Sequence, residues 1–225
     1  MAAPPPASRA PAGLRERKKA RTRQAISDIA TGMFMERGFE AVTVAEIAEA
    51  ADVSVKTVFN YFGSKEELFL DREAEIFAAI TGAIADRPQG RSITEALGAQ
   101  LADNRIPAGG GWGGLHDPDG YALFRRFLST WEESPSLQAR YRLSNERLAG
   151  ALRAALAAEV GLDGGDDRVR VMAAMIVGVI QLRYETLSAA VLSEAPADEV
   201  ERRVRALVAE GMARVARAFP DLDRG

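Results

Sequence analysis

The chain has 225 residues, of which 47% are hydrophobic, and its 29 basic and 32 acidic side chains give a formal net charge of -3. This size and composition allow a substantial buried core in one or two domains. The sequence contains no cysteine and one histidine. These counts exclude disulfides and cysteine nucleophiles and leave little scope for a metal site or a resident cofactor, so we expect none. No signal-peptide core and no uncharged apolar run of membrane-spanning length occurs, so we expect a cytoplasmic protein without a membrane partner.

The charge is distributed unevenly along the chain. Residues 1–65 carry ten Lys or Arg and seven Asp or Glu, whereas the remainder carries 19 and 25. Within the first 25 residues, seven side chains are basic and only Glu16 is acidic. This asymmetry suggests a polyanionic partner for the N-terminal part, and the alternative is a solvated tail followed by a charged helix face.

Almost the whole chain follows a helical pattern of apolar residues, and no alternating β-branched run predicts a strand. We therefore expect an all-α fold that begins with a disordered, Pro- and Ala-rich tail over residues 1–13. Helices are expected over about 14–37, 43–51, 54–62, 64–86, 92–105, 121–133, 135–161, 168–192 and 198–219.

Local signals set the expected helix ends. Three capping boxes begin at Thr43, Ser64 and Ser92, where a hydroxyl and a carboxylate satisfy free backbone amides. The helix from Ser64 is expected to run unbroken to about residue 86. Residues 107–120 contain six glycines and two prolines, so a loop is predicted there, and its Trp112 and His116 suggest a lid.

The short helix over residues 54–62 has two chemically different faces at about 100° per residue. Its outer face carries a cation, an amide, hydroxyls and a phenol but no carboxylate, from Ser54, Lys56, Thr57, Asn60 and Tyr61. The opposite arc holds Val55, Val58 and Phe62, with Phe59 on its border. The polar groups match base edges and phosphates of DNA, and a thymine methyl suits an apolar contact such as Phe59. An ordinary surface helix of a bundle is the alternative.

The segments TVAEIA (43–48), ADVS (51–54) and TVFNYFGSKEEL (57–68) closely resemble the TetR family of bacterial transcriptional regulators. The resemblance covers about residues 15–70. It implies an all-helical homodimer with an N-terminal three-helix, homeodomain-like helix-turn-helix domain and a larger helical-bundle domain for ligand binding and dimerisation. We therefore expect a DNA-binding domain over 14–63 and a ligand-binding and dimerisation domain over 64–225.

The resemblance also implies which residues contact DNA. Ser54, Lys56 and Thr57 occupy positions near base edges or the adjacent backbone. Two positions depart from the family pattern: Asp52 replaces a turn glycine, and Phe59 replaces a frequent tyrosine, so a phosphate-bonding hydroxyl is missing. The full set implied for DNA binding is Thr43, Ser54, Lys56, Thr57, Phe59, Asn60, Tyr61 and Lys65.

Two further features of the chain bear on its partners. The basic segment Arg9–Arg23 could reach the minor groove or phosphates, or could be a solvated tail and helix start. In the second domain, an aromatic stripe and a Met-bearing helix predict either ordinary core or a cavity for a small hydrophobic effector. The residues expected to line that cavity are Phe124, Phe127, Trp131, Met172, Met175, Ile176, Val179 and Tyr184.

The predicted function is a dimeric, TetR-like regulator, a repressor released from a palindromic double-stranded DNA operator by a small hydrophobic ligand. The alternative is a helix-turn-helix regulator without a ligand switch. A helical enzyme is disfavoured, because the sequence has no nucleophile motif or phosphate-binding loop. Residues 134–187 loosely resemble the second domain of actinobacterial regulators that bind acyl-CoA-like molecules.

Overall fold

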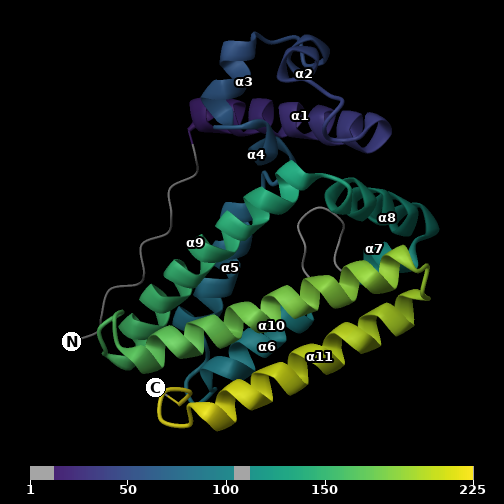
Figure 1. The fold of residues 1–225 in the computed structure, drawn as a ribbon. Helices are drawn as coiled ribbons and strands as arrows, with labels where there is room; N and C mark the ends of the chain where they lie inside the picture. Colours follow the sequence, from purple (N-terminus) through teal and green to yellow (C-terminus); the bar gives the residue numbers. More distant parts are fainter. Residues whose placement is uncertain (1–12, 104–111, 225) are drawn as a thin grey trace. The chain divides into compact units, whose positions relative to one another are not determined.

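The computed structural model describes residues 13–103 and 112–224, and all regular structure in these ranges is helical (Figure 1). The predicted all-α fold is confirmed. The expected disordered tail lies outside the described residues except for Gly13, and so do residues 107–111 of the expected loop. The helices are α1 (Leu14–Arg37), α2 (Val44–Ala50), α3 (Val55–Tyr61), α4 (Lys65–Phe69), α5 (Glu73–Ala85), α6 (Ile93–Ala102), α7 (Trp112–His116), α8 (Pro118–Glu132), α9 (Pro135–Val160), α10 (Asp167–Leu192) and α11 (Ala197–Ala218).

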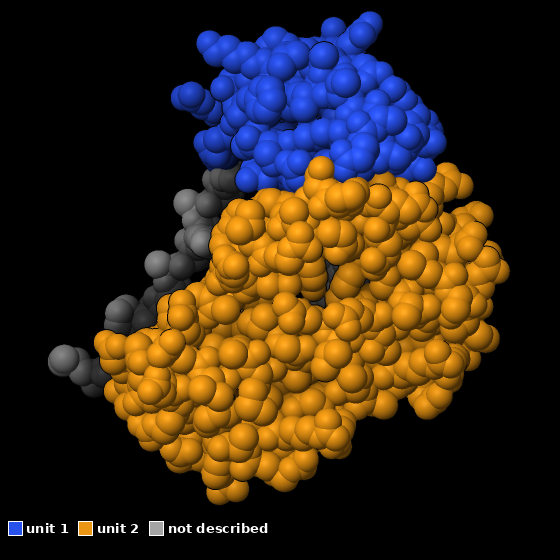
Figure 2. All heavy atoms as spheres, viewed as in Figure 1, with its two compact units in different colours: residues 1–71 blue, residues 72–225 orange. Residues whose placement is uncertain are grey.

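Contacts within the chain divide it into two compact units, residues 1–71 and 72–225 (Figure 2). The division falls later than the domain boundary expected between residues 63 and 64. The reason is that α4 packs on α1 within the first unit, with Leu68 and Phe69 buried. The roles of the two units as separate functional domains remain a prediction.

The first unit is built around α1. The ring of Phe34 packs at a tilt against that of Phe39 with centroids 4.8 Å apart, and Phe69 meets the edge of Phe39 at 6.1 Å. α2 and α3 close over this core through buried apolar side chains such as Ile47 and Val58. Burial of these aromatic and aliphatic groups holds three short helices that could not persist alone.

The helix expected from Ser64 to residue 86 is interrupted, which corrects the sequence prediction. At the break, Arg23 donates to the carbonyl oxygen of Asp71 at 2.8 Å, and Ser27 donates to its carboxylate at 2.6 Å. Both partners lie on α1, more than 40 residues earlier in the chain. These long-range hydrogen bonds hold Asp71 in the break between α4 and α5.

The glycine-rich segment is also partly helical, in contrast to the predicted loop. Asp117 caps α8 by accepting from the amide of Gly120 at 2.9 Å, and Pro118 stands in the first turn. A Cβ on Gly120 would lie only 2.4 Å from the carbonyl oxygen of Gly114. This glycine permits close approach between α7 and α8 and does not break the helix.

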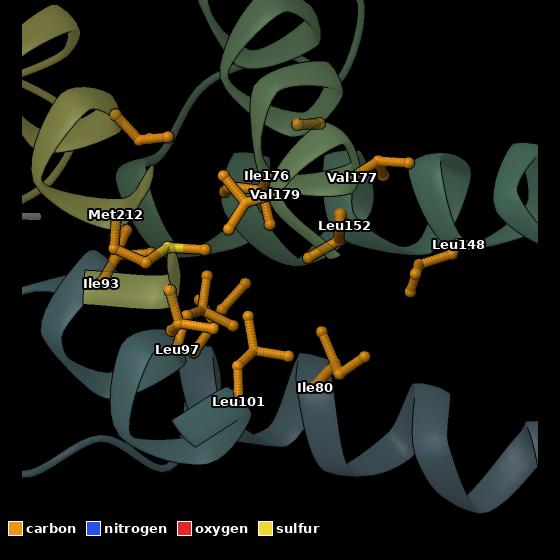
Figure 3. Packing of buried hydrophobic residues seen from close by; sticks show 14 of the residues in the cluster. Ile80, Ile93, Leu97, Leu101, Leu148, Leu152, Ile176, Val177, Val179 and Met212 are labelled. Atoms are coloured by element: carbon orange, nitrogen blue, oxygen red, sulfur yellow. The ribbon is translucent and has the colours of Figure 1, made fainter. Parts of the chain in front are cut away.

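The second unit has one large core centred on α10, which packs against α8, α9 and α11 (Figures 1 and 3). Figure 3 shows Ile176 and Val179 of α10 pointing toward Leu97, Met212 and neighbouring apolar side chains. α10 is long and apolar enough to cross a membrane by length and composition. Ten of its residues are buried, nine of them in this core, so its composition is that of a core helix.

Candidate nucleic-acid interface

The turn between α2 and α3 has the geometry of a helix-turn-helix. Asp52 adopts a left-handed backbone with φ of 51°, a conformation that Asp tolerates better than most residues. The amide of Val53 donates to the carbonyl of Ala48 at 2.9 Å, which closes the turn. Ser54 then caps α3 by accepting from the amide of Thr57 at 3.0 Å. Aspartate therefore replaces the expected glycine while the turn keeps its geometry.

The two faces of α3 differ in burial, as their composition predicts. Val58 and Phe62 are 1% and 2% exposed and anchor the helix in the core of the first unit. Lys56 and Asn60 are exposed, and Thr57 and Tyr61 are half-buried. The exposed face of α3 is thus polar and positively charged, with no acidic residue between 54 and 62.

Two apolar side chains of α3 are also exposed. Phe59 is 50% exposed and Val55 is 40% exposed. Phe59, which the helical pattern placed on a border, belongs to the outer surface. Val55, which the same pattern placed on the buried arc, does too, and this corrects the prediction. A helical wheel cannot show which apolar residues of one face contact the core. Here Val58 and Phe62 make that contact and Val55 stays exposed.

Thr43, at the start of α2, is exposed but internally hydrogen-bonded. Its hydroxyl donates to Glu46 at 2.7 Å, and its amide donates to the same carboxylate at 2.8 Å. Hydrogen bonds from Arg37 and then from Thr43 lower the pKa of Glu46 to about 2. If Thr43 donated its hydroxyl to a DNA phosphate, it would give up its hydrogen bond to Glu46. The positive charge of Arg37 offsets the negative charge of Glu46 beside Thr43.

Two basic side chains that were expected to be near DNA, Lys65 and Arg23, lie against aromatic rings. The Lys65 ammonium lies 4.3 Å from the Phe39 ring centroid, and burial lowers its pKa against the opposing effect of nearby carboxylates. The Arg23 guanidinium lies over Phe62 at 4.7 Å while it bonds Asp71. Arg23 therefore stabilises the first unit, and a contact of the basic arm with DNA stays a prediction. The remaining basic residues of α1, from Arg15 to Arg21, are exposed, whereas Arg9 lies outside the described residues.

The predicted effector-binding residues fall into three groups in the second unit. Met172 and Ile176 are fully buried in the core, and Val179 nearly so. Trp131 and Tyr184 meet in an aromatic cluster with ring centroids 5.6 Å apart. Partly exposed side chains pack at the margin of the core, from Phe124, Phe127 and Met175.

Tyr141 of α9 completes this aromatic cluster and was not predicted. Its ring centroid lies 5.2 Å from that of Trp131 and 5.5 Å from that of Tyr184. Its spacing to Leu148 along α9 is the signal that could have found it. Arg183, on the next helix, donates to the carbonyl of Leu101 at 2.9 Å, and burial lowers its pKa to about 10, partly offset by Tyr141. His116, which was expected to belong to a lid, has its Nδ1 atom 3.7 Å from a carboxylate oxygen of Asp198.

A partly buried ion cluster links α5 and α9 within the second unit, and sequence analysis missed it. Glu73, the first residue of α5, accepts from both terminal nitrogens of Arg140, at 3.0 and 2.9 Å. Arg147 adds a bond at 3.2 Å. Burial alone would raise the pKa of Glu73, but Arg140, Ser144 and Arg147 outweigh burial and lower it.

We expect the Glu73→Gln variant to be less stable at pH 7 by about 1.5–3 kcal/mol, the usual contribution of hydrogen bonds to charged groups. Because the folded-state pKa is lowered, this contribution is present above the unfolded-state pKa of Glu73 and is lost as the pH falls through the folded-state value. Urea unfolding at pH 7 and at acid pH measures it. Glu75→Gln is the control, because Glu75 also lies on α5 but forms an exposed pair with Arg72, which precedes the helix. Loss of this exposed pair should change the stability little. A Glu73→Gln deficit that is equally large at acid pH would contradict the assignment.

A first unit in which α2 and α3 form a helix-turn-helix beside α1, joined to an all-helical second unit, defines the class of helix-turn-helix regulators. Residues 26–71 match the family of bacterial regulatory proteins known as the tetR family. The HTH-type transcriptional regulator TcmR of Streptomyces glaucescens is 35% identical over 157 residues, which cover 69% of this chain and 67% of TcmR. The chain belongs to the TetR family of DNA-binding transcriptional regulators. This confirms the resemblance and the prediction that the chain is not an enzyme.

A second relative matches a shorter stretch, and a solved structure is similar over most of the chain. The HTH-type transcriptional repressor KstR2 of Rhodococcus jostii is 34% identical over 86 residues, or 35% of this chain and 41% of KstR2. The solved SmeT–triclosan complex is similar over 86% of this chain and 91% of that chain, with a TM-score of 0.52 and 17% identity. That similarity shows the shared fold of the two chains.

Proposed function

We propose that this chain is a cytoplasmic repressor that binds a palindromic operator as a homodimer and is released by a small hydrophobic effector. The exposed, acid-free face of α3 carries the proposal for DNA, because it presents Lys56 and Asn60 outward while Val58 fixes the helix. Relatives named as repressors support the direction of regulation. The first unit would bind DNA, and the second would bind effector and partner.

The DNA contacts follow from the position of each group on the first unit. Lys56 and Asn60 would meet base edges or nearby phosphates, while Ser54 and Thr57 add hydroxyls at the start of the helix. Tyr61 and Lys65 would contact the backbone. Gel shift and footprinting with DNA from upstream of the gene test this function, and a folded dimer without sequence-specific binding would refute it.

The proposed dimer surface is the outer face of α10. Val171 and Leu182 are 51% and 50% exposed, and eleven positions separate them, so both lie on one side of the helix. The buried side of α10 packs on α11, and the two helices run side by side (Figure 1). Two such pairs related by a two-fold axis would form a four-helix interface.

Leu182→Glu is expected to shift the protein from dimer to monomer, because the change places a charge in an apolar interface. Sedimentation velocity at several concentrations measures the shift. Leu143→Glu on α9 is the matched control, since Leu143 is equally exposed but lies on another helix. If both variants remain dimers, the proposed interface is wrong.

The effector site would form around the aromatic cluster of Trp131, Tyr141 and Tyr184. Its support is the concentration of aromatic and polar groups there, and a solved relative of the same fold that holds triclosan. Quenching of tryptophan fluorescence by triclosan, compared in wild type and Trp131→Phe, tests the site. Complete burial of Met172 and Ile176 favours the second candidate, a regulator whose second unit is closed core. No quenching and no release from DNA across a panel of hydrophobic compounds would support that candidate.

A further inference from the structure

The recognition helix α3 displays two large apolar side chains where polar groups would suffice for DNA binding. Val55 and Phe59 are 40% and 50% exposed and lie one turn apart, so they form a single row along the helix. Lys56 and Asn60 form the adjacent row, displaced by about 100°. The outer face of α3 therefore has an apolar row beside a polar one.

The chemistry of this face restricts what can cover the apolar row. A duplex brings phosphates, sugars and base edges to a recognition helix, and the C5-methyl group of thymine is the apolar group displayed in the major groove. Phe59 has no hydroxyl and cannot bond a phosphate in the way a tyrosine can. Residues 54–62 include Lys56 and no carboxylate, so the charge of the surrounding face suits DNA.

The position of the row within α3 suits base contact. Val55 is the first residue of the seven-residue helix α3, and the N-terminal residues of a recognition helix are those that reach base edges. Phe59 lies one turn further along the same row. Val58, about 60° around the helix from Val55, is buried, and so is Phe62 just after α3, and their packing fixes the rotation of the helix. The two apolar side chains are therefore held outward by the packing of the first unit.

We propose that Val55 and Phe59 read thymine C5-methyl groups in each operator half-site, beside the base pairs contacted by Lys56 and Asn60. The proposal rests on the operator binding proposed above. In this proposal, the two side chains contribute to sequence specificity through apolar contact with a methyl group and without a hydrogen bond. Discrimination between thymine and uracil follows from it directly.

The experiment replaces each thymine of the footprinted operator, one at a time and in both half-sites, with deoxyuridine. Fluorescence anisotropy at one fixed salt concentration then gives the affinity of wild type for each duplex. At one or two thymines per half-site, substitution is expected to lower affinity about fourfold for each methyl group removed, the effect of one buried methyl group. Phe59→Ala should bind the thymine and deoxyuridine duplexes equally at the position that Phe59 reads, and Phe59→Tyr should still discriminate.

Leu123→Ala is the matched control, because Leu123 is also 50% exposed but lies on α8 in the second unit. It should discriminate as wild type does. Specific binding without any deoxyuridine effect would overturn the methyl readout and leave the proposed function standing. Discrimination that persists in both Phe59→Ala and Val55→Ala would also overturn it. Absence of specific binding by folded wild type would overturn both proposals. The wild-type measurements decide the matter even if a variant folds poorly.

Discussion

Lys56→Ala is expected to weaken operator binding by at least about tenfold. A good base contact contributes about 1–3 kcal/mol of discrimination, and the substitution would act in both half-sites of a dimer's operator. Lys56 is exposed and forms no ion pair within the described part of the chain, so its removal leaves the first unit intact. Anisotropy titrations, with circular dichroism and melting temperature as checks on folding, measure the effect.

The same variant distinguishes two ways of binding DNA. If Lys56 touches a phosphate, affinity falls similarly for all sequences, and the slope of log K against log salt decreases by about one unit for each phosphate that the variant no longer neutralises. If Lys56 touches a base, specificity relaxes at one position of each half-site. Arg153→Ala, an exposed change on α9, is the control for removal of one positive charge. Unchanged affinity in a well-folded Lys56→Ala protein would remove Lys56 from the interface.

Gly211→Ala is expected to destabilise the second unit by about 1–3 kcal/mol, the usual effect of overpacking. A Cβ at Gly211 would lie 2.8 Å and 2.9 Å from the two methyl carbons of Val179, where α10 packs on α11. The side chain of Val179 is branched at Cβ and cannot easily turn away. This clash outweighs the gain of about 1 kcal/mol that alanine brings to a helix interior. Chemical unfolding monitored by circular dichroism gives the value.

Compensation by a second change provides the sharper test. Val179→Ala should remove much of the penalty of Gly211→Ala, because it empties the space that the new methyl group needs. Gly150→Ala on α9 is the matched control. Its Cβ would meet only the end of the Arg153 side chain, at 3.8 Å, so this variant should gain stability. Additive destabilisation in the double variant would show that the two sites do not meet.

Capping residues made several helix starts predictable from sequence. Thr43 and Ser92 form complete capping boxes, and Ser134 with Pro135 begins α9 as expected. These signals operate within three or four residues, so no tertiary information is needed to read them. The two faces of α3 were equally predictable, apart from Val55.

Two errors arose because packing overrode the local sequence signal. The break between α4 and α5 depends on Arg23 and Ser27 reaching Asp71 from α1. The helical geometry around Gly120 depends on its close approach to the Gly114 carbonyl. In each case local propensity indicated the opposite, and packing decided the outcome.

The amino-acid sequence by itself determined that this protein is an all-helical TetR-family regulator, and which polar groups α3 carries. The helical fold and the polar groups of α3 follow from periodicity and capping. The family follows from the resemblance that residues 43–68 carry at fixed spacing. Only the tertiary structure decided that Val55 and Phe59 face outward, that Arg23 serves the core, and that Tyr141 joins Trp131 and Tyr184. The physical reason is that exposure and pairing depend on which neighbouring helix covers a side chain, and that neighbour is set by packing of the whole unit.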